Sequence, residues 1–399
     1  MKLWTMLGAL ALAGCAATTA PVASDAPANA PVVSQAVRLD SVPEARLRAA
    51  GAEVLFWSQE QREANFRAME TIFPGHVVKA GARPRALPAG TPLAISPAEV
   101  DGFMAAQKIA GLIVLKDGQV VLERYGLGFT PQGRWTSFSV AKSFTSTLVG
   151  AAIRDGAIRS VDDPVTRYIP ELAGSGYDGV SVAQLLTMTS GVRWNEDYTD
   201  PNSDVARMLT VPVPPGMDPT VAYMRTLPRE TAPGEKFVYK TGETNLIGVL
   251  VSKATGKPLA NYLSEKVWRP YGMEADAFWM IDQSGQEIGG CCLSVSLRDY
   301  ARMGQLVLDG GEGLVPAGWF AEATKAQVAF PRAGFGYGYQ WWAYPEGRFG
   351  AQGIFGQSIL IDPAARVVVA MVSAWPKATD SALSAERMAF QAKLLAAAR

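Results

Sequence analysis

The sequence predicts a mixed α/β fold with a further helical part: an antiparallel sheet flanked by helices, carrying an inserted, mainly helical domain. Strand-like segments occur in two groups far apart in the 399-residue chain, and the stretch between them is mainly helical. The simplest assembly pairs the early strands with the late strands in one antiparallel sheet. We therefore expect an α/β domain formed by residues 37–138 and 331–399, with residues 139–330 as the inserted helical domain.

The early strands form a predicted β-hairpin. Residues 111–116 and 119–126 are apolar runs rich in β-branched side chains. Asp117-Gly118 stands between them and suits the positive φ angles of a two-residue turn.

The late strands are predicted from aromatic and β-branched composition. They cover residues 336–344, 356–362 and 366–373, and the Asp-Pro-Ala-Ala segment at 362–365 favours a turn between the last two. An amphipathic helix is expected to close the chain at 381–398. In the middle of the chain, helical segments are expected at 182–188, 243–254, 259–267 and 297–308.

Composition narrows the classes of function. With 37 basic and 37 acidic residues the formal net charge is zero, which offers no electrostatic footprint for nucleic acid. The chain has one histidine, His76, in a Pro- and Gly-rich stretch, and three cysteines. So few histidines and cysteines argue against a metal site, and the single histidine also argues against a Ser-His-Asp triad. Nothing in the sequence implies a cofactor. Cys291 and Cys292 are adjacent, do not easily close an unstrained disulfide, and are expected to pack in the interior.

The N-terminus is expected to be a targeting segment. Residues 1–14 combine an early lysine with an apolar run too short to span a bilayer, as in a secretory signal. Leu12-Ala13-Gly14-Cys15 resembles a bacterial lipobox, which implies lipidation of Cys15. Residues 15–36, rich in Ala, Pro, Ser and Thr, then form a flexible tether. The expected location is the cell envelope, at the periplasmic face of the outer membrane, with membrane contact only through the anchor at Cys15.

Ser139-Val140-Ala141-Lys142 places a lysine three residues after a serine at the start of a predicted helix, residues 138–155, which Gly156 is suited to end. Side chains at i and i+3 share a helix face about 5 to 6 Å apart, so the Lys142 amine can reach the Ser139 hydroxyl. A serine hydroxyl needs a group to remove its proton before it acts as a nucleophile, and lysine is the candidate here. The Ser139 N–H lies in the first turn, lacks an intrahelical partner and can bind a developing negative charge.

A second constellation follows at Pro233-Gly234, which precedes Tyr239-Lys240-Thr241 and a predicted helix containing Asn245. With this segment the chain resembles the serine β-lactamase and penicillin-binding superfamily. Within it, the chain is similar to the branch of class C β-lactamases, related esterases and 6-aminohexanoate-dimer (nylon oligomer) hydrolases. The resemblance covers residues 55–376, and residues 137–144 and 193–198 place the chain nearest the nylon-oligomer branch.

The resemblance implies a β-lactamase-like fold with Ser139 as nucleophile and Lys142 and Tyr239 as the groups that move protons. Tyr239 serves as the base if nearby positive charge stabilises its phenolate. Alternatively, Lys142 is neutral, which requires lowering its pKa by about 3, or about 4 kcal/mol. The sequence leaves both alternatives open.

The third family motif departs from the usual pattern. In the segment 350–356, Ala351 stands where a lysine or histidine is usual. That cation normally helps to hold the carboxylate of a β-lactam or cell-wall peptide, so its loss argues against those substrates. The backbone N–H of Ile354 is the expected second oxyanion donor beside that of Ser139. The resemblance further implies substrate contacts from Thr241, Gln352 and Gly353, and from Tyr198 on a loop that closes over the substrate.

The sequence thus predicts a lipid-anchored serine hydrolase of the Ser-Lys-Tyr type that cleaves a small-molecule ester or amide through an acyl-enzyme. The implied activity is that of a 6-aminohexanoate-dimer hydrolase or a carboxylesterase. β-Lactamase or D-amino-acid peptidase activity is the alternative within the fold. A catalytically silent binding lipoprotein is the alternative of another class.

Overall fold

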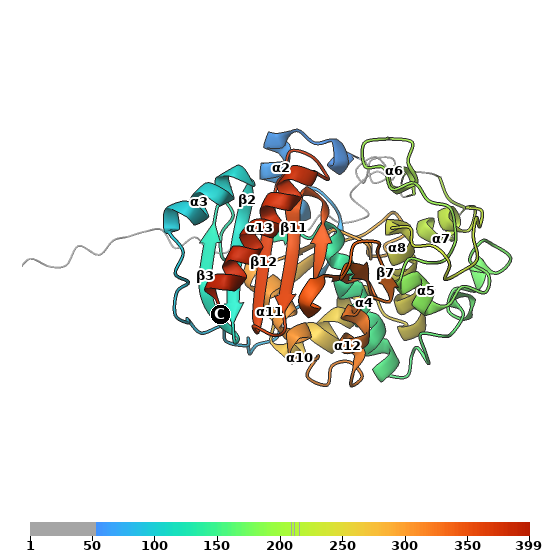
Figure 1. Ribbon diagram of the computed structural model, residues 1–399. Helices are drawn as coiled ribbons and strands as arrows, with labels where there is room; N and C mark the ends of the chain where they lie inside the picture. The colour runs from blue at the N-terminus through green and yellow to red at the C-terminus, as the bar shows by residue number, and fades with distance from the viewer. Residues whose placement is uncertain (1–52, 209, 211, 215) are drawn as a thin grey trace, which may run out of the picture. The chain divides into compact units, whose positions relative to one another are not determined.

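A large antiparallel sheet organises the protein. The structure, a computed structural model, describes residues 53–208, 210, 212–214 and 216–399, all within one compact unit. The sheet has eight strands in the order β3-β2-β12-β11-β10-β9-β8-β7 (Figure 1). Its strands are β2 (Ile109–Lys116), β3 (Gln119–Tyr125), β7 (Val328–Ala329), β8 (Gly336–Tyr337), β9 (Trp342–Ala343), β10 (Phe349–Gly353), β11 (Gln357–Asp362) and β12 (Val367–Ser373).

The expected fold class, with early and late strands in one antiparallel sheet, is confirmed. β2 pairs with β12 in antiparallel register, with Val114 opposite Val369. The β2–β3 hairpin turns at Asp117 and Gly118, whose φ angles are 49° and 76°. These are the positive values that the Asp-Gly turn requires.

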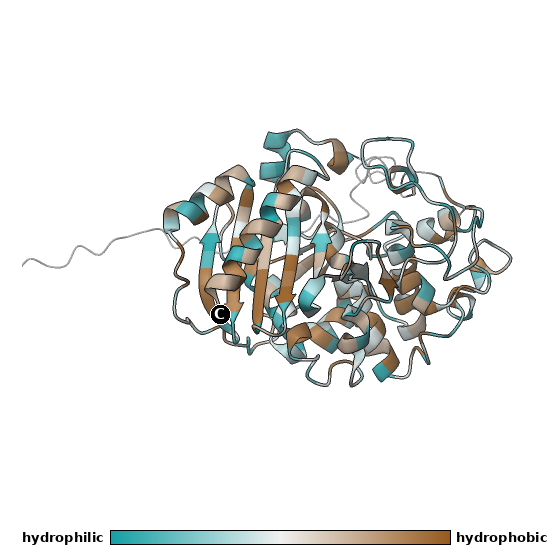
Figure 2. Ribbon diagram, viewed as in Figure 1, coloured by the Kyte–Doolittle hydropathy of each residue, from teal (hydrophilic) through white to brown (hydrophobic). Residues whose placement is uncertain are grey.

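Side chains alternate along each strand, so each strand contributes to both faces of the sheet, and helices bury both faces. On β12, Val367, Val369 and Met371 point into a cluster that also contains residues of α3 (Pro97–Ala106) and α13 (Ser381–Ala397). Val368, Ala370 and Val372 point into the main core on the other side, where α11 (Leu297–Leu308) packs. Figure 2 shows hydrophobic residues along the strands beneath α13.

A second, smaller sheet was not expected from the sequence. It has four antiparallel strands in the order β1-β5-β6-β4: β1 (Gly75–Val78), β4 (Trp135–Thr136), β5 (Ala277–Met280) and β6 (Leu293–Val295). These strands have two to four residues, and every side chain of β5 is buried. Segments of this length are too short to show the alternation that reveals a strand in a sequence. The single strand expected at 336–344 is likewise two short strands, β8 and β9.

The remaining helices largely follow the sequence prediction. Residues 138–155 divide into a 3-10 turn, η3 (Phe138–Val140), and helix α4 (Ala141–Arg154), and Gly156 follows with φ 76°. The helix expected at 259–267 ends early, because a π turn (Ser264–Trp268) follows it. The other helices are α2 (Gln59–Asn65), α5 (Val182–Leu186), α6 (Asp204–Arg207), α7 (Pro219–Met224), α8 (Thr241–Thr255), α9 (Leu259–Leu263), α10 (Arg269–Tyr271) and α12 (Trp319–Thr324).

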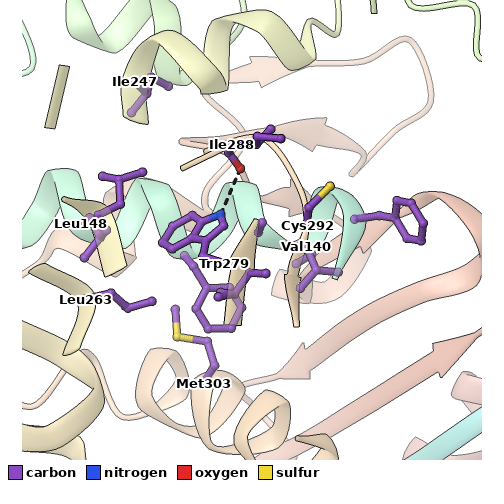
Figure 3. Close-up of a cluster of buried hydrophobic side chains, with 14 of the residues drawn as sticks. Val140, Leu148, Ile247, Leu263, Trp279, Ile288, Cys292 and Met303 are labelled. Atoms are coloured by element: carbon purple, nitrogen blue, oxygen red, sulfur yellow. Dashed lines mark hydrogen bonds between the residues drawn. The ribbon is translucent and has the colours of Figure 1, made fainter. Parts of the chain in front are cut away.

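The small sheet and α4 meet in a buried cluster next to η3. Figure 3 shows the Trp279 ring of β5 among Val140, Leu148 and Met303, with its indole N–H donating to the Ile288 carbonyl at 3.0 Å. Because Val140 belongs to both this cluster and η3, the core fixes the turn that carries Ser139.

The division into domains at residues 138/139 and 330/331 stays a prediction, and α11, from the middle range, packs against the large sheet. Residues 1–14, the tether and Cys15 lie outside the described residues. Among the described residues, no helix has the length and apolar character needed to cross a bilayer. In the same part of the chain, no three potential metal-binding side chains gather together.

Candidate active site

Ser139 lies on η3, between β4 and α4, and its side chain is nearly buried. The preceding residue, Phe138, has φ 43°, a left-handed conformation that is unusual for an aromatic residue and brings Ser139 to the edge of a cavity. Lys142 follows in the first turn of α4, and its Nζ lies 3.3 Å from the Ser139 Oγ. The structure therefore brings the two side chains together.

Lys142 is 1% exposed and makes two further hydrogen bonds. Its Nζ donates to the Thr241 Oγ1 at 3.0 Å and to the Gly290 carbonyl oxygen at 2.7 Å. Burial lowers the pKa of Lys142 from 10.5 to about 7, and the negative charge of Glu196 partly opposes this shift. Near neutral pH a substantial fraction of this amine is therefore unprotonated and able to accept a proton.

Tyr239 lies just before α8 and faces both Ser139 and Lys142. The Lys142 Nζ is 5.3 Å from the Tyr239 ring centroid, and the ring stacks on Trp342 at 5.7 Å. Burial, followed by the charge of Glu196, raises the pKa of Tyr239 far above its usual value near 10, and a hydrogen bond with Ser139 opposes that rise. The phenol is therefore protonated at neutral pH.

Glu196 is a site residue that the sequence did not single out as functional. Its carboxylate accepts hydrogen bonds from the Tyr198 hydroxyl at 2.7 Å and the Thr241 N–H at 2.9 Å, and also from the Thr241 hydroxyl and the Trp194 indole. The signal available in the sequence was an acidic residue between two aromatic residues in the segment 193–198. Glu196, Thr241 and Lys142 thus form a continuous hydrogen-bonded chain that ends at Ser139.

Thr241, which the sequence placed among the substrate contacts, lines a small cavity that also borders Ser139. The residue is 6% exposed, and its hydroxyl lies between Lys142 and Glu196. Tyr198 does line the cavity beside Ser139, but its hydroxyl donates to Glu196.

The two expected oxyanion donors lie on neighbouring segments. A Cβ built at Gly353 would lie 3.1 Å from the Ser139 nitrogen and 2.7 Å from the Ser137 carbonyl oxygen, so β10 and η3 approach closely only because residue 353 is glycine. Within the described residues, neither the Ser139 N–H nor the Ile354 N–H donates to a backbone group of another segment.

Three aromatic rings hold these two peptide groups in place. Phe138 precedes Ser139, and Phe355 follows Ile354. Both phenylalanines have positive φ, and their ring centroids are 5.1 Å apart. Phe66 packs against them at 4.9 and 5.3 Å. Packing of this kind stabilises the unusual backbone conformation of both residues.

Ser139 borders two cavities. The first, the catalytic cleft, has a volume of about 320 Å³ and is lined by Ser139, Glu196, Tyr198, Tyr239, Trp342, Gln352, Gly353, Ile354, Trp375 and Arg387, among others. The second, the apolar pocket, has about 70 Å³ and is lined mainly by hydrophobic side chains such as Leu55, Met280 and Ile288. Cys291 and Cys292 also line it and, contrary to expectation, form a disulfide with each other.

Gln352 and Gly353 both line the catalytic cleft, as expected. The Gln352 amide nitrogen donates to the Tyr344 hydroxyl at 2.5 Å, and its oxygen accepts from the Arg387 guanidinium at 2.8 Å. Arg387 comes from α13 and was not found from the sequence, since nothing in the local sequence links that helix to the site. His76 lies on β1 and bonds to Glu287 at 2.7 Å, outside the cleft.

The fold and this arrangement define a hydrolase of the β-lactamase class. Residues 98–393 match the family described as Beta-lactamase, and the chain belongs to that family. The 6-aminohexanoate-dimer hydrolase of Paenarthrobacter ureafaciens is 35% identical over 284 residues, which cover 66% of this chain and 72% of that enzyme. A β-lactamase of Pseudomonas fluorescens is 27% identical over 44% of this chain and 48% of its own length.

Solved structures share the fold. A Bacillus anthracis protein assigned by name as a 6-aminohexanoate-dimer hydrolase has a TM-score of 0.74 at 23% identity, covering 84% of this chain and 93% of that chain. The octameric penicillin-binding protein homologue from Pyrococcus abyssi has a TM-score of 0.60, also at 23% identity, covering 75% and 76%. The family match and the 35% identical relative confirm the family resemblance expected from the sequence, and the solved structures confirm the fold.

Proposed function

We propose that the chain hydrolyses an ester or linear amide bond through an acyl-enzyme on Ser139, with Lys142 as the general base. The observation that carries this proposal is the buried Lys142 amine, 3.3 Å from the Ser139 oxygen, with its pKa lowered to about 7. A base with a pKa near the working pH transfers protons most effectively. Burial raises the pKa of Tyr239, which makes its phenolate the less favoured base.

In the acylation step, Lys142 removes the Ser139 proton as Oγ attacks the substrate carbonyl. The protonated Tyr239 hydroxyl, which interacts with Ser139, donates a proton to the departing alcohol or amine and recovers one from the lysine. Water then attacks the acyl-enzyme by the reverse route, which releases the acid and restores Ser139.

The developing oxyanion is bound by the N–H groups of Ser139 and Ile354. Two fixed backbone donors stabilise negative charge in the transition state without reorganisation. Thr241 and Glu196 hold the Lys142 amine toward Ser139, and Glu196 also sets how readily that amine loses its proton, since its charge favours the ammonium form.

The substrate class follows from similarity and from the cavities. The 35% identical relative is named for hydrolysis of the 6-aminohexanoate dimer, a linear amide. Here both the apolar pocket and the larger catalytic cleft border Ser139, so each offers space for a part of a linear substrate beside the scissile bond. Tyr198, at the border of both cavities, covers the reacting group and excludes water.

A labelling experiment tests this proposal. The purified protein is treated with a fluorophosphonate probe and assayed with p-nitrophenyl butyrate and the 6-aminohexanoate dimer, alongside Ser139→Ala. Ser143→Ala is the matched control: Ser143 lies in the first turn of α4, directly after the η3 turn that carries Ser139, and its hydroxyl donates to the Gln340 carbonyl oxygen at 2.7 Å. We expect an adduct and turnover in wild type and Ser143→Ala only. Equal signals from wild type and Ser139→Ala would remove Ser139 from the mechanism, and absence of both adduct and turnover in wild type would favour the silent binding protein.

β-Lactam hydrolysis is a second candidate, supported by the relative named as a β-lactamase in Pseudomonas fluorescens. Nitrocefin turnover in the same preparation, at a higher kcat/KM than the linear ester and amide, would favour it.

We further propose that Cys15 carries a lipid that anchors the protein to the periplasmic face of the outer membrane. The lipobox-like Leu12-Ala13-Gly14-Cys15 supports this. In cells fed an alkyne-palmitate, wild type is expected to become labelled and to fractionate with outer membranes, and Cys15→Ser to lose both properties. Labelling of Cys15→Ser at the wild-type level would contradict the proposal.

A further inference from the structure

Arg387 is a buried cation without an acidic partner in the described part of the chain. It lies on α13, is 5% exposed, and its guanidinium sits 4.9 Å above the Trp375 ring centroid. Among the described residues its one hydrogen bond goes to the Gln352 amide oxygen, at 2.8 Å, and its buried Nε has no partner there. A guanidinium has five N–H donors, so this side chain has unused donor capacity.

Such an arrangement is costly unless an anion completes it. A charge removed from water is stabilised by an opposite charge or by a full set of hydrogen bonds, and an amide oxygen and an aromatic face supply only part of this. Burial lowers the pKa of Arg387, which is the direction expected for a cation that lacks compensation. A guanidinium nonetheless remains protonated at neutral pH.

Arg387 lines both the catalytic cleft and a third cavity. This third cavity, the rear cavity, has a volume of about 280 Å³ and shares Gln352 and Arg387 with the catalytic cleft. Its other charged lining residues are Arg332, Arg348 and Glu346, so cations outnumber anions. Arg348 pairs with Glu346, whereas the Arg332 guanidinium lies over the Phe335 ring at 4.1 Å.

We propose that Arg387 binds the carboxylate end of a linear substrate whose scissile carbonyl lies at Ser139, and that the rear cavity accommodates the segment beside that carboxylate. The inference rests on the proposed function for the reacting end. It also explains how Ala351 is tolerated at the third motif: the cation comes from α13, beside β10, rather than from β10 itself. Arginine suits this role because its planar donors can hold both carboxylate oxygens.

The test compares matched substrates that differ only in charge. Mono-4-nitrophenyl adipate and its methyl ester place the charge on the acyl side, and N-hexanoyl-6-aminohexanoate and its methylamide place it on the leaving side. For each pair the measured quantity is the ratio of kcat/KM for the charged member to that for the neutral member. We expect a ratio of about ten or more in wild type for at least one pair, which also locates the carboxylate.

Arg387→Gln is expected to lower that ratio about tenfold, and Arg387→Lys to give an intermediate value, since lysine keeps the charge without the fork of donors. Because each ratio compares two substrates on one protein, partial misfolding does not change it. Lys393→Gln is the matched control: it removes an exposed cation from the same helix, one that pairs with Glu99, and should keep the wild-type ratio. A wild-type ratio near one for both pairs, or an unchanged ratio in Arg387→Gln, would overturn the proposal.

A binding arm separates this inference from the proposed function. Calorimetric titration of adipate into Ser139→Ala should show binding that Ser139→Ala/Arg387→Gln lacks. If wild type hydrolyses neither pair, the proposed function fails, and adipate binding that depends on Arg387 would still support the anion site. Absence of adipate binding to Ser139→Ala would count against the site.

Discussion

The unusual protonation of Lys142 gives the most direct test of the site, because it affects stability as well as activity. Replacing Lys142 with Met keeps the length and most of the volume of the side chain but removes the amine. The wild-type amine has a pKa lowered from 10.5 to about 7 by burial, which corresponds to about 5 kcal/mol of unfavourable free energy for the charged form in the folded protein.

The sign of the pH dependence follows from proton binding. Between pH 7 and 10.5 the unfolded chain holds a proton on Lys142 that the folded protein has released, so the free energy of unfolding rises with pH in this window. From pH 7 to pH 9 this single group contributes a rise of about 2 kcal/mol. Lys142→Met removes the contribution and should also be more stable than wild type at pH 7.

The assay is urea unfolding followed by tryptophan fluorescence at pH 7 and pH 9. Wild type should gain about 2 kcal/mol more than Lys142→Met between the two values. Lys393→Met makes the same exchange at an exposed position of α13 and should follow wild type. Equal gains for wild type and Lys142→Met would refute the reasoning, since the buried amine would then bind its proton as it does in water. In wild type, kcat/KM should rise with pH through a midpoint near 7.

Three further predictions concern the groups around Lys142. Tyr239→Phe should lower kcat by about 10²- to 10⁴-fold with little change in KM, measured with p-nitrophenyl butyrate; an unchanged kcat would exclude the phenol from proton transfer. Glu196→Gln removes the charge that raises the pKa of Lys142. The acid limb of the pH profile of kcat/KM should therefore move to lower pH, by up to about one pH unit. Movement to higher pH would contradict this electrostatic role. Gly353→Ala places a Cβ 3.1 Å from the Ser139 nitrogen and 2.7 Å from the Ser137 carbonyl oxygen, and should lower kcat by about 10²-fold; full activity together with a wild-type Tm would argue against an oxyanion site there.

The sequence was most informative where function depends on neighbours along the chain. Ser139 and Lys142 are three residues apart, so the helix itself brings them together. The hairpin turn at Asp117-Gly118 and the end of α4 before Gly156 follow from local backbone preferences in the same way.

The sequence was least informative where contacts join distant segments. Lys142 meets Thr241 across 99 residues, and Arg387 meets Gln352 across 35 residues. Glu196 sits in a polar loop whose composition resembles that of any exposed turn. The small sheet was missed for a different reason, because its strands have only two to four residues and show no clear alternation.

The chain by itself therefore predicted the proposed nucleophile, its lysine neighbour and the antiparallel sheet, since helix periodicity, turn chemistry and strand composition are local properties. Only the tertiary structure favours Lys142 over Tyr239 as the proposed base. The choice depends on burial, which lowers the pKa of Lys142 and raises that of Tyr239, and burial is produced by the packing of residues far apart in the sequence. The position of the Arg387 cation was decided in the same way, by the packing of the last helix against the sheet that carries the cleft.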